Sequence, residues 1–96
     1  MKNGNPRIIE RVQTGIRIEK RILKVLKGMA EYADLSLGDL MEGILLHNFE
    51  GRCPFGPEEV AGIAKLKELY GLTLTAADSH KLVEGDDSGR KPAKSK

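Results

Sequence analysis

The chain has 96 residues, of which 40% are hydrophobic and 31% are charged, and its formal net charge at pH 7 is +2. A chain of this length holds one small domain with a modest core, and this ordinary globular composition excludes a chain that is disordered throughout. Its apolar runs are far shorter than the ~20 residues that span a bilayer, and its beginning lacks the apolar stretch of a signal peptide. We therefore expect a cytoplasmic protein without a membrane segment. The single cysteine, Cys53, forms no intrachain disulfide and fits a reducing compartment.

The charge is distributed unevenly along the chain. Residues 1–27 carry eight lysines and arginines against two glutamates, a net charge of +6, whereas residues 28–89 have a net charge of −8 and residues 90–96 of +4. A basic beginning of this kind creates a local positive field that suits phosphate groups. The alternative interpretation is a solvated basic surface that has no partner.

The first predicted elements are a flexible arm and a short strand. Residues 1–10 are expected to be a flexible basic arm, because Asn3-Gly4-Asn5-Pro6 disfavours regular structure. Over residues 11–18 apolar and polar residues alternate with period two, which predicts a β-strand with one apolar and one polar face. The apolar face holds Val12, Thr14, Ile16 and Ile18, and the polar face holds Arg11, Gln13, Gly15 and Arg17.

This strand has no partner of matching quality elsewhere in the chain. An isolated strand leaves its backbone N–H and C=O groups without hydrogen bonds, so the same strand of a second copy is the expected partner. The sequence therefore predicts a homodimer with a two-stranded antiparallel ribbon, whose outer face presents Arg11, Gln13 and Arg17 twice.

Two helical stretches follow the strand. From Glu19 the apolar residues recur at helical spacing, which predicts a first helix that ends near Asp34. Ser36, with Asp39 three residues later, is a capping signal for a second helix that ends at Phe49. Apolar residues cover more than half of the circumference of this second helix, so we expect it to pack against more than one element.

Residues 51–84 are predicted to form a helical extension. A third helix is expected from Pro57, which suits a first helical turn, to Gly71, which suits a helix end. A second capping signal at Thr75 precedes a short helix that is expected to end near Val83.

The order and length of these parts resemble the ribbon-helix-helix family of DNA-binding proteins, of the Arc, MetJ and CopG type. The resemblance covers residues 12–49, about 40% of the chain, and consists of Val12-Gln13-Thr14-Gly15-Ile16-Arg17-Ile18, the first helix, the turn at Leu35-Ser36 and the second helix. It implies a mostly α fold, the ribbon-helix-helix homodimer, with one strand per chain paired antiparallel across the dimer. The expected organisation is a flexible basic arm (1–10), the dimerisation and DNA-binding domain (11–50), a C-terminal helical extension (51–84) and a disordered basic tail (85–96).

The resemblance also implies which residues contact double-stranded DNA. In this family the paired strands enter the major groove, where the outward residues read bases; by position these are Gln13, Gly15 and Arg17. Arg17 has the chemistry to recognise guanine, and Gln13 has the chemistry to recognise adenine. Gly15 has no side chain that could contact a base, so we expect fewer base contacts than is usual in this family, or base contacts that shift towards Arg11. Contacts to the DNA backbone are expected from Arg11, Lys20 and the start of the second helix at Ser36, Leu37 and Gly38.

The expected function is that of a homodimeric, sequence-specific transcriptional regulator of the repressor type. One alternative is an antitoxin whose residues 57–84 cover a toxin. The other is a dimeric scaffold whose basic strand face binds an acidic protein or RNA.

The sequence does not favour an enzyme. No nucleophile has both a base and an orienting partner in its context, and no glycine-rich phosphate loop follows a strand. The spacing of His47, Cys53 and His80 matches no compact zinc arrangement, so we expect neither a metal nor another cofactor.

Overall fold

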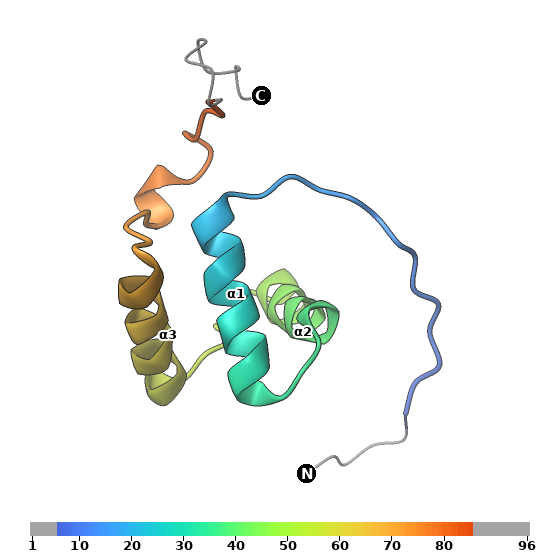
Figure 1. Ribbon diagram of the computed structural model, residues 1–96. Coiled ribbons are helices and arrows are strands. Elements are labelled where there is room, and N and C mark those ends of the chain that lie inside the picture. Colours follow the sequence, from blue (N-terminus) through green and yellow to red (C-terminus); the bar gives the residue numbers. More distant parts are fainter. Residues whose placement is uncertain (1–5, 86–96) are drawn as a thin grey trace.

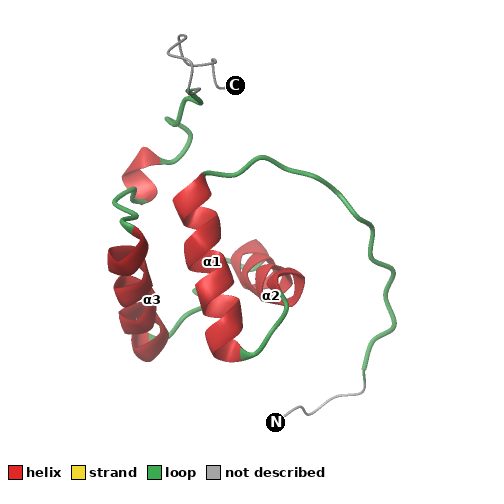
Figure 2. Cartoon of the chain, viewed as in Figure 1, coloured by secondary structure: helices red, strands yellow, loops and turns green. Residues whose placement is uncertain are grey.

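The computed structural model describes residues 6–85, which contain three α-helices and one 3-10 turn (Figures 1 and 2). The elements are α1 (Lys20–Ala33), α2 (Leu37–Phe49), α3 (Pro57–Tyr70) and η1 (Ala76–Asp78). The prediction of three helices is confirmed, and each lies within about a residue of its expected bounds. The short helix expected from Thr75 to near Val83 is only the single turn η1. No helix in residues 6–85 combines the length and the apolar character that a membrane crossing needs.

Local hydrogen bonds fix where each helix begins. The Glu19 carboxylate accepts hydrogen bonds from the backbone N–H groups of Arg21 and Ile22, at 2.8 and 2.9 Å, and thereby caps α1. The hydroxyl of Ser36 accepts a hydrogen bond of 3.1 Å from the Asp39 N–H at the start of α2, as the capping signal predicts. These bonds satisfy donors that a helix start otherwise leaves without a partner.

All three helices end with the same backbone arrangement. Asp34, Gly51 and Gly71 follow α1, α2 and α3, and each has a left-handed backbone with φ of 62°, 71° and 70°. The N–H of each bonds to the carbonyl three positions back, and the next N–H bonds to the carbonyl five positions back. This is the Schellman arrangement, which glycine favours because it has no Cβ. The predicted stop at Gly71 is confirmed.

Helix α1 is the centre of the fold. In residues 6–85, α2 and α3 each pack on α1, which lies between them, and the backbones of α2 and α3 do not approach each other (Figure 1). The buried core consists of Val25 and Ala30 on α1 and Leu40 on α2. Gly28 lets α3 approach closely, since a Cβ there would stand 3.0 Å from a methyl carbon of Leu66. Within residues 6–85, α2 packs on α1, and a single chain does not test the prediction that a second element, across the dimer, also covers it.

The prediction of a β-strand over residues 11–18, and with it the ribbon-helix-helix fold, is wrong. The part of the chain that the structure describes has no strand or sheet, and residues 6–19 form an extended segment without regular hydrogen bonds (Figure 2). Alternation with period two gives an extended chain two faces, but a strand also needs a neighbouring backbone to bond to. No element in residues 20–85 supplies one, so Val12 and Ile16 stay 78% and 68% exposed.

The predicted flexible arm and disordered tail lie partly outside the described residues. Residues 1–5 and 86–96 fall outside them, and of the predicted arm only residues 6–10 are described, as the beginning of the extended segment.

Replacement of Leu40 by alanine should destabilise the chain by about 2 to 5 kcal/mol, because Leu40 is one of three buried core residues and the cavity adds to the lost burial. Urea unfolding at fixed protein concentration measures this loss. Leu69→Ala is the control, since Leu69 is 70% exposed and its truncation should change the free energy of unfolding by less than about 1 kcal/mol. Equal losses in the two variants would contradict this description of the core.

Candidate nucleic-acid interface

The extended segment, residues 6–19, carries most of the residues that the sequence singled out. It leaves the beginning of α1 and sweeps around the side of the molecule on which α2 lies (Figure 1). Every residue from 6 to 18 is exposed, and none of these side chains belongs to the core. The segment is therefore free to present its polar groups to a partner.

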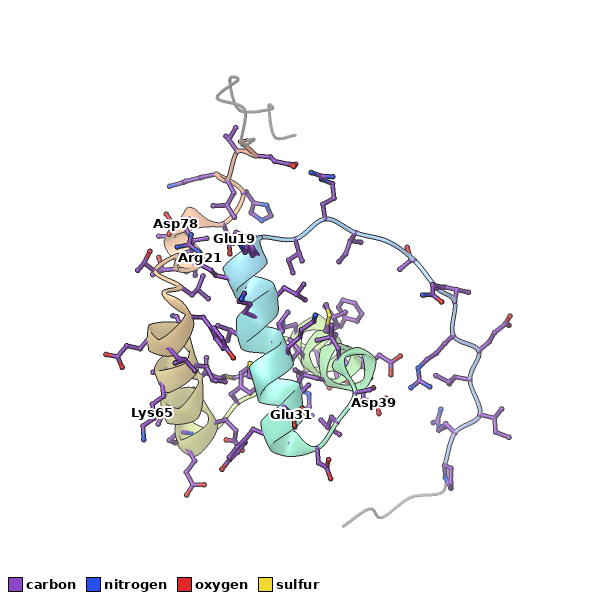
Figure 3. The ribbon with its side chains drawn as sticks, viewed as in Figure 1. Glu19, Arg21, Glu31, Asp39, Lys65 and Asp78 are labelled. Carbon is purple, nitrogen blue, oxygen red and sulfur yellow. The ribbon has the colours of Figure 1, made fainter. Side chains whose placement is uncertain are left out.

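Arg11 attaches one end of the segment to α2. Its Nε and Nη2 atoms donate to the two carboxylate oxygens of Glu42, both at 2.8 Å, and Nη2 also lies 3.2 Å from Asp39 Oδ1. Asp39 lies on the side of α2 that faces the segment (Figure 3). The hydrogen bonds and the charge of Glu42 raise the pKa of Arg11, and the hydrogen bond from Arg11 in turn lowers the pKa of Glu42. All three side chains remain largely accessible to water.

Arg17 attaches the other end of the segment to Glu84, near the end of the described chain. Its guanidinium pairs through Nε and Nη2 with both oxygens of the Glu84 carboxylate, so two parts of the chain separated by 67 positions lie side by side. Ile16 and Ile18 line the same shallow hollow as Leu82. The Arg17 side chain is still 82% exposed.

The remaining predicted base-reading residues lie between these two attachments. Gln13 and Gly15 are exposed, and among the described residues the Gln13 side chain makes no hydrogen bond. A Cβ on Gly15 would meet nothing within 4 Å. The glycine is therefore not needed for a close approach inside this chain.

The predicted DNA-backbone residues are only partly brought together. Ser36, Leu37 and Gly38 form the start of α2, and Arg11 reaches the same region through Asp39. A Cβ on Gly38 would meet nothing within 4 Å, so this surface is open. Lys20 is exposed at the start of α1, where it lines the hollow beside Arg17.

Two basic residues of α1 have structural partners that the sequence analysis missed. Arg21 donates from Nε to the Glu19 carboxylate at 3.1 Å and from Nη1 to the Gly71 carbonyl oxygen at 3.0 Å. The Lys24 ammonium lies 5.8 Å from the centroid of the Tyr70 ring, within range of a cation–π interaction. Both contacts tie the start of α1 to the end of α3. Arg21 and Lys24 are three residues apart and therefore lie on one face of α1. This spacing is the signal in the sequence from which a shared neighbour, the end of α3, could have been predicted.

Glu19 is the N-cap of α1, a role that the sequence analysis did not assign. Its partial desolvation favours a higher pKa, but the hydrogen bonds from the Ile22 N–H, the Arg21 side chain and the Arg21 N–H outweigh this, and the pKa of Glu19 is lowered. Figure 3 shows Glu19 and Arg21 together near η1 at the start of α1. The signal was an acidic residue directly before the change to helical spacing.

The metal-capable side chains lie apart. The His47 Nδ1 atom is 2.8 Å from the Gly43 carbonyl oxygen, and the Cys53 thiol donates to the Phe55 carbonyl oxygen at 3.3 Å, so both make local contacts. Within residues 6–85 no three His, Cys, Asp or Glu side chains gather in a way that could hold a metal ion.

The chain matches no protein-family model, no curated protein and no solved structure.

The attachment of Arg11 to α2 should depend on pH. Because the pKa of Glu42 is lower in the folded chain than its ordinary value of 4.5, the ion pair is present above that value and is lost as the pH falls through the lower folded pKa. We expect the backbone amide of Arg11 to become more mobile over this acidic range, as measured by ¹⁵N relaxation.

The variant Glu42→Gln should show the same mobility already at neutral pH, since the amide cannot carry the charge. Glu50→Gln is the control, because Glu50 pairs with Arg52 and has no contact with the segment. Unchanged mobility of Arg11 in Glu42→Gln would show that other contacts hold the segment.

Proposed function

We propose that this protein is a homodimeric, DNA-binding transcriptional regulator that contacts duplex DNA through its basic extended segment. The observation that carries the proposal is that Arg11 and Arg17 extend from an exposed segment and are held there by carboxylates that are themselves exposed. These arginines do not support the core, so a partner can replace the carboxylates without disturbing the packing of the helices.

The pairing geometry supports DNA as that partner. Each arginine presents two N–H groups to the two oxygens of one carboxylate, the same geometry with which a guanidinium binds a phosphate or the O6 and N7 atoms of guanine. Exposed ion pairs contribute little to stability and are screened by salt. A dense array of DNA phosphates therefore competes well with Glu42 and Glu84 for the segment.

The distribution of charge supports a polyanion such as DNA as the partner. Residues 1–27 carry a net charge of +6 and residues 28–89 carry −8, so the two parts of the molecule differ in sign. The basic stretch includes the extended segment, and DNA phosphates would displace Glu42 and Glu84 from its arginines on binding. Arg17 has the chemistry to recognise guanine and Gln13 to recognise adenine, and we assign sequence discrimination to these two residues.

Exposed apolar side chains support the homodimer. In addition to Val12 and Ile16 on the segment, Leu46 and Phe49 on α2 are 64% and 76% exposed. Large apolar groups on neighbouring elements are typical of a surface that is covered by another protein. A second copy would cover these groups and double the basic segment, so the bound DNA site should have dyad symmetry.

Replacement of Arg17 by alanine should weaken binding to a duplex enriched from a random pool by about 5- to 150-fold, the value of one bidentate base contact. Binding to a scrambled duplex should change much less. Fluorescence anisotropy at fixed salt concentration measures both affinities. Arg11→Ala, by contrast, should weaken binding to both duplexes and lower the slope of log K against log salt by about 0.9.

Two variants provide controls for the DNA experiment. Arg52→Ala removes an exposed, ion-paired arginine that is not on the segment, and it should leave both affinities unchanged. Glu84→Gln breaks the same ion pair as Arg17→Ala but keeps the arginine, so it should bind DNA at least as tightly as the parent. If Arg17→Ala binds every duplex as the parent does, Arg17 does not read DNA.

Replacement of Phe49 by serine should shift the protein from dimer to monomer, because it removes the most exposed large apolar side chain of α2 from the proposed dimer surface. Sedimentation equilibrium measures the mass. Leu69→Ser is the control, since Leu69 is exposed to a similar extent but lies on α3, and it should leave the mass unchanged. A parent protein that is monomeric at micromolar concentration would rule out the homodimer.

A further inference from the structure

The two ion-paired arginines of the extended segment direct their guanidinium groups towards the rest of the chain. Arg11 pairs with Glu42 on α2 and also lies 3.2 Å from Asp39, which is on the side of α2 that faces the segment (Figure 3). Arg17 pairs with Glu84, which follows η1 in the chain. These carboxylates therefore occupy the same N–H groups that a nucleic acid would bind.

These ion pairs make no contribution to the packing of the helices. None of the paired side chains belongs to the buried core, and all of them are accessible to water. Exposed ion pairs contribute little to the stability of a fold. The segment also stays exposed over residues 6–18, so the pairs hold it without burying it. Their main consequence is for the availability of the two arginines.

An arginine that is occupied by a carboxylate of its own chain binds DNA less tightly. DNA contacts the guanidinium only after the carboxylate has left it. The apparent dissociation constant is therefore raised by the inverse of the fraction of chains in which the arginine is free. For an exposed ion pair this factor is about two to five.

We propose that Glu42 and Glu84 are intrachain competitors that restrain DNA binding by the extended segment. Glu42 occupies Arg11, which is assigned to contacts with both duplexes, so Glu42 weakens binding to every duplex. Glu84 occupies Arg17, which is assigned to base recognition, so Glu84 weakens binding to the preferred site. This inference rests on the proposed DNA binding and adds what sets the affinity of that site.

The two competitors act at separate places. Glu42 belongs to α2, whereas Glu84 lies beyond η1. Their arginines are six residues apart, which corresponds to about 20 Å along an extended chain. Either arginine can leave its carboxylate while the other stays paired, so the effects of removing the two carboxylates should add.

Repulsion between a carboxylate and DNA would also weaken binding, without any competition. Repulsion acts whether or not the arginine is present, whereas competition requires the arginine. Removal of each carboxylate in the presence and in the absence of its arginine therefore separates the two causes.

Replacement of Glu42 by glutamine should raise the affinity for both the selected and the scrambled duplex. This gain should be about two to five times larger in the parent chain than in Arg11→Ala, because only the parent has an arginine to release. Fluorescence anisotropy at low salt concentration measures the affinities, since salt screens the ion pair. Glu10→Gln is the control. Glu10 precedes Arg11 on the segment and has no ion pair among residues 6–85, so its effect should be the same in both backgrounds.

Replacement of Glu84 by glutamine should release Arg17, and the gain should be confined to the selected duplex. There it should again be about two to five times larger in the parent chain than in Arg17→Ala. On the scrambled duplex the effect of Glu84→Gln should be the same with and without Arg17. Circular dichroism checks that the variants are folded, which is expected because the replaced side chains are accessible to water.

The outcomes separate this inference from the proposed function. If DNA binds but each gain is the same with and without the arginine, the carboxylates act by repulsion and the inference is wrong, while the proposed DNA binding stands. An arginine-dependent gain of Glu84→Gln that is equal on both duplexes would overturn the link between Glu84 and base recognition. If neither the parent nor the double variant Glu42→Gln, Glu84→Gln binds any duplex, the proposed function is wrong and the inference is wrong with it.

Discussion

The burial of the apolar stripe of α1 is the interaction on which the rest of the structure depends. Helices α2 and α3 pack on opposite sides of α1, and within residues 6–85 their backbones do not approach each other. Without α1, neither α2 nor α3 would have an apolar surface to pack against. Val25, Ala30 and the close approach at Gly28 let α1 pack against two neighbouring helices. From the first turns of α1, Arg21 and Lys24 add polar contacts to the end of α3. Hydrophobic burial supplies the cohesion, and these polar contacts fix the relative position of the helices.

The core of residues 6–85 has three buried residues, and this small size explains why many apolar side chains are exposed on the surface. A chain of this size buries a limited fraction of its apolar groups, so many stay in contact with water. They include Val12 and Ile16 on the extended segment, Leu46 and Phe49 on α2, and Leu69 on α3.

The helices were predictable from the sequence because their signals are local. The cap at Ser36, the stop at Gly71 and the apolar spacing between them act within a few residues, and the structure places them as expected. The strand was not predictable, because an alternating pattern describes only the two faces of residues 11–18, whereas a strand depends on a neighbouring backbone that this pattern does not specify. The sequence identified Arg11 and Arg17 as exposed basic groups, but their pairing with Glu42 and Glu84 depends on the folded chain.

The connections between the helices have a consequence for how the chain folds. Each helix ends in the same tight backbone arrangement, and connectors of three residues (34–36) and seven residues (50–56) lead into the next helix. Helical chains with such short connections fold in about microseconds to milliseconds, because little loop entropy opposes their contacts. The pair of Arg17 and Glu84 joins positions 67 residues apart. The helices should therefore assemble first, and the extended segment should attach to a bundle that is already formed.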